Sequence, residues 1–595
     1  MSACLLLCLS LTLTGCLQMN EGEPYYGRVT TPRAQEFRWS DGGLPQTFDP
    51  ALAAAPPDTD AVRALFEGLT DYDPQTLAAV PGVASRWESS ADKRVWTFYL
   101  RRDARWSNGD AVTAQDFVRS WQRTLSLGTR APHAHLLENI VGASPLPTPP
   151  APASATEQNE KSEKSAAVRE SKKDAAQTVP AFGAEAVNDY TLRIELQEPD
   201  ENFPALVAHP IFRPVHNVRD EEGSTVLAEP IVSNGPFRLT QVASDGVTLE
   251  RAPSYWDAQT VNLNRVRFIP TGSAEEALDR YRAGDVDAVT NAGFEPLALK
   301  LLAPYKDFRR ATFGALTFYK FNTSHAPFND VRVREALAIA IDRERISEDQ
   351  MDGASEPAQT FLPAQGAAAA QSNASAPNNE QPSALSHDIT RAKNLLAEAG
   401  YPQGVGFPKV RLLVNRNEQQ RQIAQSIASM WRKALGVETE VILKNWEEYE
   451  TAVNAGDYDV VRKGMVMQTM DEAANMRMMF EETEAVEVVA SEEPAAKAAE
   501  SPASASVKEK ANEKGAVESQ ALPPPVRPTI LSQADALKEL PAMPIYFASS
   551  YSLVKPYVVG FDNNLLDAPS LKRVRLDTTW QAPKRKEAVW FKVGE

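Results

Sequence analysis

Cysteine is nearly absent from this sequence of 595 residues, and the three cysteines present, Cys4, Cys8 and Cys16, all lie close to the N-terminus. Because no thiol follows Cys16, the body of the protein has no internal disulfide, no cysteine-ligated metal site and no cysteine nucleophile. The stability of the folded body therefore depends on packing alone.

Positive charge and long apolar runs are also scarce. Lys and Arg number 62 against 79 Asp and Glu, which gives a net charge of −17. A chain of this kind has no basic stripe to neutralise phosphates, so nucleic acid and anionic membrane surfaces are disfavoured as partners. No stretch approaches the roughly 18 apolar residues of a membrane-spanning helix. The length and the 43% of hydrophobic residues predict about two to four packed domains.

Catalytic signatures are missing as well. The sequence contains no Gly-x-Ser-x-Gly motif, no phosphate-binding loop and no dinucleotide fingerprint. Only His133 and His135 are spaced like metal ligands, and no third ligand adjoins them, so a surface or pocket pair is preferred over a metal site. Acidic pairs such as Asp457 and Asp459 are too common here to indicate a glycosidase. We therefore predict a non-enzymatic protein without metal or cofactor.

The N-terminal segment predicts export and lipid attachment. Residues 1–15 carry no charged side chain and include an apolar run, and the four residues that end at Cys16, Leu-Thr-Gly-Cys, resemble a bacterial lipobox. We expect residues 1–15 to be a signal peptide, Cys16 to be a lipid anchor and residues 16–36 to be a tether. The alternative is a short apolar N-terminus that happens to end in Gly-Cys, since no Lys or Arg precedes the apolar run.

Three long tracts lack aromatic residues entirely. Residues 144–181, 364–386 and 481–528 are dominated by small, charged and amide side chains with frequent proline. Such tracts bury too little apolar surface to offset the entropy of ordering the chain. We predict that they are solvated insertions or linkers.

Between these tracts, strand patterns alternate with helix patterns. Apolar residues occupy every second position in 95–100 and 190–196, and recur at helical spacing in 331–346 and 391–399. A further helix is expected from about Thr271 to Gly284, followed by a strand at 286–290. The alternation is typical of an α/β chain in which helices flank parallel strands.

Capping, turn and core residues follow from the same patterns. Asp388 or Thr390 is expected to cap the helix at 391–399, and Gly400 is expected to end it. The tripeptides that begin at Asn108 and Asn234 indicate turns. Large apolar side chains are expected in the core: Trp96, Phe98, Leu100 and Trp106.

A series of sequence blocks occurs in a fixed order from about Phe37 to Asp577. The blocks are Phe48-Asp-Pro50, Leu65-Phe-Glu-Gly-Leu69, Ala84 to Phe117, Asn234-Gly-Pro-Phe237, Tyr255-Trp256, Arg280 to Asp287, Phe328 to Leu337 and Leu396 to Tyr401. In content and spacing, this series resembles the family-5 solute-binding proteins, which are the extracellular oligopeptide-binding proteins of ABC importers. The order is interrupted only at the three tracts.

The resemblance implies a two-lobed periplasmic-binding-protein fold with an extra third domain. The first lobe would comprise residues 37–63, 216–313 and 542–577, the extra domain residues 64–215, and the second lobe residues 314–541. The tract at 144–181 would be an insertion in the extra domain, and the other two tracts would be insertions in the second lobe. The lobes would close over a ligand about a hinge.

The resemblance also implies where the ligand lies. Family members hold an extended peptide by its backbone, with wet side-chain pockets, and fix its α-ammonium with a carboxylate. The matching stretch of this chain, 457–468, contains Arg462, and Gly464 falls where a backbone contact is usual. Met465 replaces a tryptophan of the family, and Gln468 replaces the carboxylate that holds the ammonium.

Because glutamine accepts a hydrogen bond but does not neutralise a positive charge, the change at Gln468 bears directly on ligand choice. Asp471 or Glu472 would supply a carboxylate if the loop were shifted by three or four residues. Beyond Met476, an acidic tract replaces the segment that usually follows in the family. Part of the cleft edge of the second lobe is therefore expected to be missing.

Three further positions match ligand-contacting residues of the family. Asn291 matches a polar residue that contacts the peptide backbone, Trp446 matches a wall of the cleft, and His133 replaces a pocket tyrosine. Two of these positions are explained equally well without any contact to a ligand. Asn291 suits a turn after the strand at 286–290, and Trp446 suits a core or surface aromatic.

Two functions remain open from the sequence. The first, which we favour, is a monomeric, lipid-anchored protein of the bacterial cell envelope, periplasmic or extracellular, that captures oligopeptides for an ABC permease and its ATPase subunits. The second is a surface lipoprotein that keeps the scaffold for adhesion or structure, or that binds a non-peptide solute. The change at Gln468 favours the second function, and the ordered series of matching sequence blocks favours the first.

Overall fold

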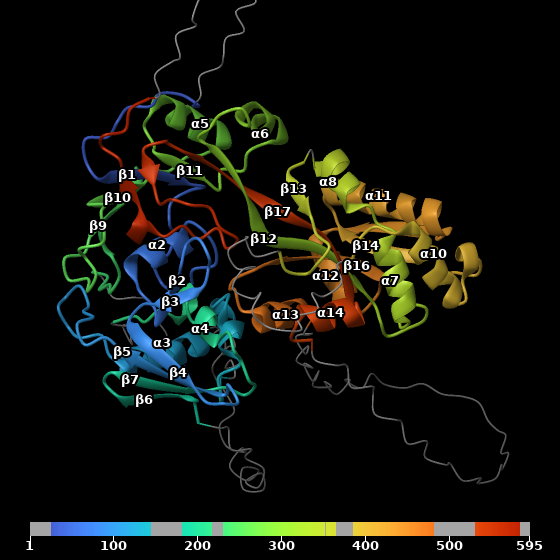
Figure 1. The fold of residues 1–595 in the computed structure, drawn as a ribbon, viewed down its shortest axis with the longest axis horizontal. Helices are drawn as coiled ribbons and strands as arrows, with labels where there is room; N and C mark the ends of the chain where they lie inside the picture. Colours follow the sequence, from blue (N-terminus) through green and yellow to red (C-terminus); the bar gives the residue numbers. More distant parts are fainter. Residues whose placement is uncertain are drawn as a thin grey trace, which may run out of the picture.

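The computed structural model describes residues 25–143, 181–216, 230–351, 353–363, 385–480 and 530–582. The predicted signal peptide and Cys16 lie outside these ranges, as do nearly all residues of the three predicted insertions. The described chain is a mixed α/β structure built around one large sheet, as Figure 1 shows. The α/β fold class expected from the alternating patterns is confirmed.

The large sheet contains strands from both ends and the middle of the chain. Its order is β15-β14-β16-β12-β17-β11-β1-β10-β9-β8, with β13 paired to β17. The strands are β1 (Glu36–Asp41), β8 (Phe237–Ala243), β9 (Gly246–Arg251), β10 (Arg265–Phe268), β11 (Ala288–Thr290), β12 (Phe308–Phe321), β13 (Ser355–Pro357), β14 (Val410–Asn415), β15 (Thr439–Lys444), β16 (Val460–Val466) and β17 (Ala542–Val554). β1 runs parallel to β10 and β11, and β14 runs parallel to β15 and β16.

Two long antiparallel strands connect the halves of this sheet. Figure 1 shows β12 and β17 running from the part that holds β1 and β11 to the part that holds β14 and β16. Their register shifts between Thr312 and Leu316, so the ladder is irregular there. The predicted boundary between the first and second lobes, 313/314, falls at this irregularity. The two lobes are thus joined through paired strands rather than through loops alone.

The predicted extra domain has its own four-stranded antiparallel sheet. Its order is β4-β5-β7-β6, from β4 (Ala84–Ser89), β5 (Val95–Leu100), β6 (Ala184–Asn188) and β7 (Thr191–Glu195). The strands predicted at 95–100 and 190–196 are therefore confirmed as β5 and β7. The core side chains Trp96, Phe98, Leu100 and Trp106 are all buried, as predicted.

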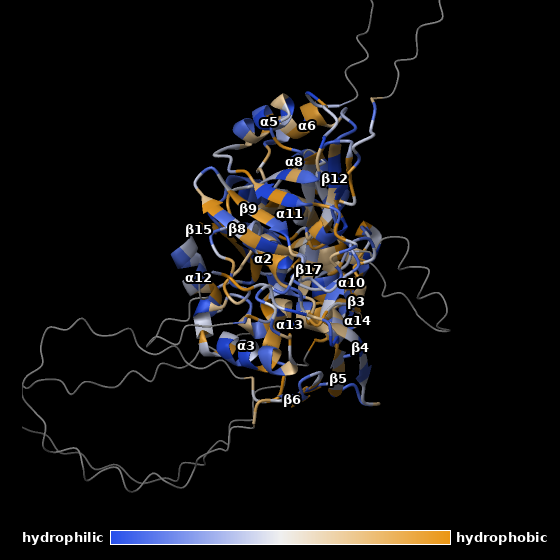
Figure 2. Ribbon diagram, turned by 90° about the vertical axis from the view of Figure 1, so that its left-hand side faces the viewer, coloured by the Kyte–Doolittle hydropathy of each residue, from blue (hydrophilic) through white to orange (hydrophobic). Residues whose placement is uncertain are grey.

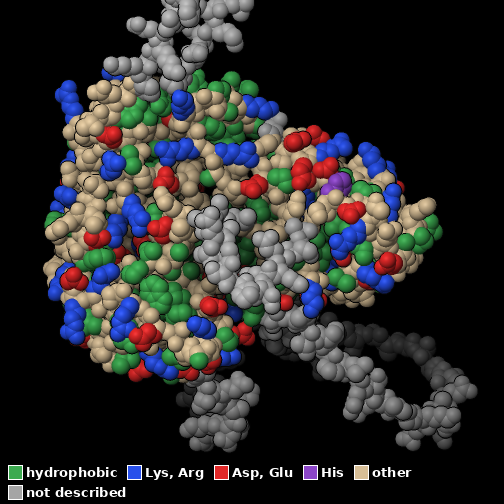
Figure 3. All heavy atoms as spheres, in the orientation of Figure 1, with side chains coloured by type: hydrophobic (Ala, Val, Ile, Leu, Met, Phe, Trp, Pro, Cys, Tyr) green, Lys and Arg blue, Asp and Glu red, His purple; other side chains and the backbone are tan. Residues whose placement is uncertain are grey.

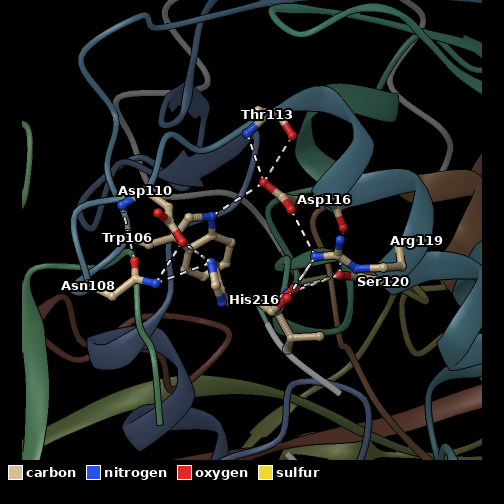
Figure 4. Close-up of polar contacts among 9 residues, drawn as sticks. Trp106, Asn108, Asp110, Thr113, Asp116, Arg119, Ser120 and His216 are labelled. Carbon is tan, nitrogen blue, oxygen red and sulfur yellow. Dashed lines mark hydrogen bonds and ion pairs between the residues drawn. The ribbon is translucent and has the colours of Figure 1, made fainter. Parts of the chain in front are cut away.

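Polar contacts fix the turn that was predicted at Asn108. Gly109 has φ +97°, a left-handed conformation that glycine adopts without strain. The Asn108 side chain accepts a hydrogen bond from the Asp110 backbone at 3.1 Å, and the His216 ring contacts Asp110 at 2.8 Å (Figure 4). These contacts tie the end of the described segment 181–216 to the extra domain.

Helix termini mostly follow the predicted caps. α5 (Ala274–Ala283) begins with the Ser273 hydroxyl accepting from the Glu276 backbone and ends at Gly284, which has φ +87°. α10 (Ile389–Glu398) begins with the Asp388 carboxylate accepting from the Arg391 backbone at 2.9 Å, so Asp388 rather than Thr390 is its cap.

One predicted helix is wrong in extent. The helical spacing over 331–346 predicted a single element, but the structure has α7 (Val331–Ile339) and α8 (Arg343–Met351). The chain breaks because the Asp342 carboxylate accepts a hydrogen bond from the Arg345 backbone at 3.0 Å and starts a second helix. Apolar spacing continues across the break because both helices cover the same core.

The remaining elements complete the layers. The helices are α2 (Asp58–Leu65), α3 (Ala114–Ser126), α4 (Phe203–Leu206), α6 (Pro296–Leu302), α11 (Glu418–Leu435), α12 (Trp446–Asn454), α13 (Glu472–Phe480) and α14 (Gln533–Glu539). The short strands are β2 (Thr70–Tyr72), β3 (Ala79–Pro81), β18 (Val558–Val559) and β19 (Arg575–Leu576). Figure 2 shows hydrophobic and hydrophilic bands along α11, which packs one face on the sheet.

The surface has no large field of one sign on the face in Figure 3, where Lys and Arg lie interspersed with Asp and Glu. In the described ranges, no helix combines the length and the hydropathy that crossing a membrane requires.

Candidate functional site

β16 carries three of the predicted ligand-binding residues, Arg462, Gly464 and Met465, and Gln468 follows two residues after its end. Gly464 and Val466 are exposed and Arg462 and Gln468 are half-buried, whereas Met465 is buried at 7% exposure. Successive residues of a strand point to opposite faces. Arg462, Gly464 and Gln468 thus share the open face, and Met465 packs on the buried face against a cluster that includes Leu316 and Phe318.

The backbone edge of β16 is open along the same stretch. β12 pairs with β16 from Val460 to Val466 on one side, but β14 pairs with it on the other side only at Val460 and Val461. Within the described part of the chain, no strand pairs with that second edge beyond Val461. An unpaired strand edge offers backbone N–H and C=O groups to an added strand.

Trp446, the first residue of α12, is a surface aromatic. It is 60% exposed, which excludes the core interpretation, and its ring stacks on Tyr449 with centroids 5.6 Å apart. The Tyr449 hydroxyl donates a hydrogen bond to the Arg462 carbonyl. Trp446 is therefore linked through Tyr449 to the strand that bears the open face.

On the first lobe, Asn291 lies at the carboxyl ends of two parallel strands. It follows β11 with φ +51°, and its amide donates to the Asp41 carboxylate at 2.7 Å, at the end of β1. Gly42 has φ +65°, and a Cβ there would lie 2.7 Å from the Asn291 carbonyl oxygen. Asn291 is thus a turn residue, as one interpretation predicted, and it also joins the strand ends where α/β folds bind ligands.

Three carboxyl groups gather around Arg63 beneath this turn. Asp41 and Asp60 are fully buried and lie within hydrogen-bonding reach of each other, and burial raises the pKa of both. Burial together with the Asp41 charge raises the pKa of Asp567 to about 6. The Arg63 guanidinium contacts the Asp60 carboxylate at 3.3 Å. Its positive charge lowers the pKa of all three carboxyl groups and so opposes the rise caused by burial.

His133 is buried where the extra domain meets the first lobe. Its Nε2 atom contacts the Ala54 carbonyl at 2.9 Å, and its ring lies 5.0 Å from that of His209 and 6.1 Å from that of His135. The Gln468 side chain lies close to His209 and raises the pKa of its ring, against the larger lowering of the pKa by burial. The structure therefore brings two predicted residues, His133 and Gln468, to one cluster of imidazoles.

The alternative carboxylates for position 468 are engaged elsewhere. Asp471 is fully buried, accepts from the Ala474 backbone at 2.6 Å and lies within hydrogen-bonding reach of Asp200 of the extra domain. Glu472 accepts from the Gln533 backbone at 2.5 Å. Neither acid replaces Gln468 on the open face in this structure.

Sequence reasoning missed the groups that join these residues. Arg63 acts electrostatically on Asp41, Asp60 and Asp567 and also on His133 and His209. Apart from Asp60, which lies three residues before Arg63 on α2, these residues come from segments far apart in the chain. No signal in the sequence could have grouped them.

In the described ranges, no group of three or more His, Cys, Asp or Glu side chains has the arrangement of a metal site.

Comparison with known proteins supplies the context for these residues. A family model, "Bacterial extracellular solute-binding proteins, family 5 Middle", matches residues 78–486. The periplasmic oligopeptide-binding protein OppA of Escherichia coli K12 is 32% identical over 444 residues, covering 73% of this chain and 75% of the relative. The probable deoxycholate-binding periplasmic protein YgiS of the same strain is 30% identical over 540 residues, covering 90% and 92%.

Among solved structures, the periplasmic murein tripeptide-binding protein MppA in its unliganded open form superposes with a TM-score of 0.67 at 26% identity. The match covers 92% of this chain and 98% of that protein. The two-lobed architecture predicted from the sequence blocks is therefore confirmed.

Proposed function

The chain belongs to the bacterial extracellular solute-binding proteins of family 5, and on this premise we propose that it captures oligopeptides between its two lobes and delivers them to an ABC importer. It would do so as a binding protein without catalytic activity, partnered by a permease and an ATPase. OppA and MppA are named as peptide-binding proteins, which supports this choice of ligand.

The observation that carries the proposal is the unpaired edge of β16. From Arg462 to Val466 the strand pairs with β12 only, so its other edge has no partner strand in the described part of the chain. Gly464, in the middle of this stretch, is exposed to solvent. A peptide added as a further strand would gain main-chain hydrogen bonds that do not depend on its sequence. This mode of recognition suits a protein that accepts many peptides.

The mechanism we propose is closure about β12 and β17. A peptide that contacts β16 on the second lobe and the loops after β1 and β11 on the first lobe would bind the closed form better than the open form. Ligand binding then shifts the open–closed equilibrium by the difference in affinity.

The test is calorimetric titration of the purified chain with a mixed pool of three- to six-residue peptides. We expect saturable binding, and a loss of about tenfold or more when the peptide backbone amides are N-methylated, because each methyl removes a main-chain donor. Gly464→Leu is expected to weaken binding similarly, since its side chain would cover the strand. An added Cβ at Gly464 meets only the flexible Arg462 guanidinium at 3.3 Å, so the variant is expected to fold.

Val405→Leu is the matched control, because Val405 is 71% exposed on the second lobe outside the strands. Absence of heat from any peptide, with an intact fold, would contradict the proposal.

A second candidate is a non-peptide solute. The relative named as probably deoxycholate-binding covers 90% of this chain, and Gln468 provides no charge for an ammonium. Titration with deoxycholate beside the peptide pool separates the two candidates.

We also propose that the protein is held at the cell envelope by a lipid on Cys16. The Leu-Thr-Gly-Cys sequence ending at Cys16 supports this. Cys16→Ser is expected to abolish incorporation of a labelled fatty acid and to move the protein from the membrane fraction to the soluble fraction.

A further inference from the structure

Both ends of the described chain lie together on the first lobe. The Tyr25 ring meets the Trp580 ring edge-on, with centroids 5.8 Å apart, and the Thr31 hydroxyl donates a hydrogen bond to the Trp580 carbonyl at 2.8 Å. The Tyr26 backbone N–H donates to the Asp307 carboxylate at 2.8 Å and fixes the first described residues to the lobe. The chain therefore enters and leaves the described structure at one area of the surface.

Helix α6 adjoins this area and exposes two leucines. The Tyr26 ring contacts the Tyr305 ring, with centroids 5.3 Å apart, and the Tyr305 backbone donates to the carbonyl of Leu302, the last residue of α6, at 3.0 Å. Leu297 and Leu301 are 69% and 65% exposed, and because they are four residues apart they share one face of the helix. Figure 1 shows α5 and α6 at the end of the molecule opposite the four-stranded sheet of the extra domain.

Basic side chains accompany these leucines. Lys300 and Lys306 are exposed, and the exposed acid nearest to α6 in the sequence is Glu295. Figure 3 shows hydrophobic side chains beside Lys and Arg over α5 and α6. At a bilayer surface, leucine enters the boundary of the acyl chains while the long lysine side chain extends to the headgroups. The exposed face of α6 therefore has the composition of a membrane contact.

The sequence that follows the described chain has the same character. Residues 583–595 lie outside the described ranges and read Pro-Lys-Arg-Lys-Glu-Ala-Val-Trp-Phe-Lys-Val-Gly-Glu, with four Lys or Arg against two Glu. The net charge of −17 disfavours an anionic surface for the whole chain, but this segment has the opposite sign. Basic residues next to Trp and Phe are typical of segments that bind anionic lipid headgroups.

We propose that the face formed by α6 and the two chain ends lies against a lipid bilayer, and that residues 583–595 bind its anionic headgroups. This inference goes beyond peptide capture and adds a second contact to the attachment proposed through Cys16. Nine residues separate Cys16 from Tyr25, and nine extended residues span at most about 30 Å. A lipid on Cys16 would therefore hold this face close to the membrane.

The experiment measures vesicle binding without the lipid. The chain from residue 16 onward, with Cys16→Ser, is sedimented with vesicles of phosphatidylglycerol and phosphatidylethanolamine, and separately with phosphatidylcholine vesicles. We expect binding to the first vesicles and none to the second. Replacing Lys584, Arg585 and Lys586 together by glutamine is expected to weaken binding about tenfold or more, because each basic residue near an anionic surface adds to the attraction. The matched control replaces two lysines and one arginine that are exposed on the second lobe, and it is expected to bind as the parent does: Lys393→Gln, Arg416→Gln and Lys433→Gln.

A second variant tests the helix. Leu297→Gln combined with Leu301→Gln is expected to weaken binding about threefold or more, since both side chains would leave the acyl boundary. The variant is expected to fold, because both leucines are mostly exposed. Val405→Gln is its control, since Val405 is 71% exposed on the second lobe.

The outcomes decide between partners. Binding that is equal for both vesicle types, or that is unchanged in the tail variant or in the leucine variant, would overturn the inference. A parent chain that stays in the supernatant with every vesicle would also overturn it and would leave a permease or a second copy as the partner of α6. Peptide titration and fatty-acid labelling of the unsubstituted protein report on the proposed function and on Cys16 separately, so a failure of either is distinguishable from a failure here.

Discussion

Asp200 and Asp471 are two acids that the fold buries together. They are 4% and 0% exposed, come from the extra domain and from the segment before α13, and lie within hydrogen-bonding reach of each other. Burial, and then the charge of Asp471, raise the pKa of Asp200 to about 8. The Arg477 guanidinium, which contacts Glu198 at 3.6 Å, opposes this shift. Burial beside Asp471 therefore favours the protonated form of the Asp200 carboxyl.

Asp200→Asn is expected to change the pH dependence of stability. Because the folded state raises the pKa of Asp200 from 3.8 to about 8, the stability from its proton is complete below about pH 4 and is lost as pH rises through about 8. Asparagine keeps a donor toward Asp471 without needing a proton. We expect a gain of about 1–3 kcal/mol in the free energy of unfolding at about pH 8.5, and a much smaller gain at about pH 5.

Thermal unfolding at the two pH values measures this difference. Glu198→Gln serves as the control, because the Glu198 side chain is 50% exposed and its ion pair contributes little at the surface. An equal effect of Asp200→Asn at both pH values would show that the carboxyl is not protonated in the folded state.

At the scale of elements, the cap of α10 is a local feature with a measurable cost. The Asp388 carboxylate accepts from the Arg391 backbone at 2.9 Å and satisfies one of the free donors of the first turn. We expect Asp388→Ala to lower the free energy of unfolding by about 1 kcal/mol, measured by urea denaturation. Thr390→Ala changes an exposed residue of the same turn and should have little effect; equal losses in both variants would reject the cap.

Local patterns were sufficient for several elements. β5, β7, α5 and α10 follow from periodicity and capping residues, because a half-buried strand or helix repeats its apolar side chains at a fixed spacing. The break between α7 and α8 did not follow, since both helices face one core and only the Asp342 hydrogen bond separates them. Pairing of β12 with β17, more than 200 residues away, has no local signal.

At the scale of the whole molecule, β12 and β17 connect the two lobes, so closure has to bend or shift this paired segment near 313–315. All three cysteines lie within the first 16 residues, so spin labels are placed in a background in which Cys4, Cys8 and Cys16 are replaced by serine. Labels at Val187 on β6 and Lys433 on α11 report the distance between the extra domain and the second lobe, and both positions are exposed. We expect this distance, measured by double electron–electron resonance, to shorten on saturation with peptide.

A label pair at Lys393 and Lys433, on α10 and α11 of the second lobe, should show no change. A distance between Val187 and Lys433 that stays constant at saturating ligand would reject closure as the binding mechanism.

The sequence by itself determined the α/β class, several of the strands and helices, the absence of cysteine chemistry and, through the ordered blocks, the resemblance to a two-lobed binding protein. It also identified Gln468 as the position where this chain departs from a carboxylate. These are properties of local patterns and of residue identity. Because side chains alternate between the two faces of a strand, the residue order of β16 also indicates in part which face each side chain occupies.

Only the tertiary structure decided what surrounds those residues. It placed Met465 in a core and Trp446 on the surface, and it engaged Asp471 with Asp200 rather than with the open face. It also brought Arg63, the three histidines and Gln468 together from segments separated by up to about 400 residues. Charge and hydrogen bonding act through space, so a cluster assembled by long-range packing leaves no trace in local spacing.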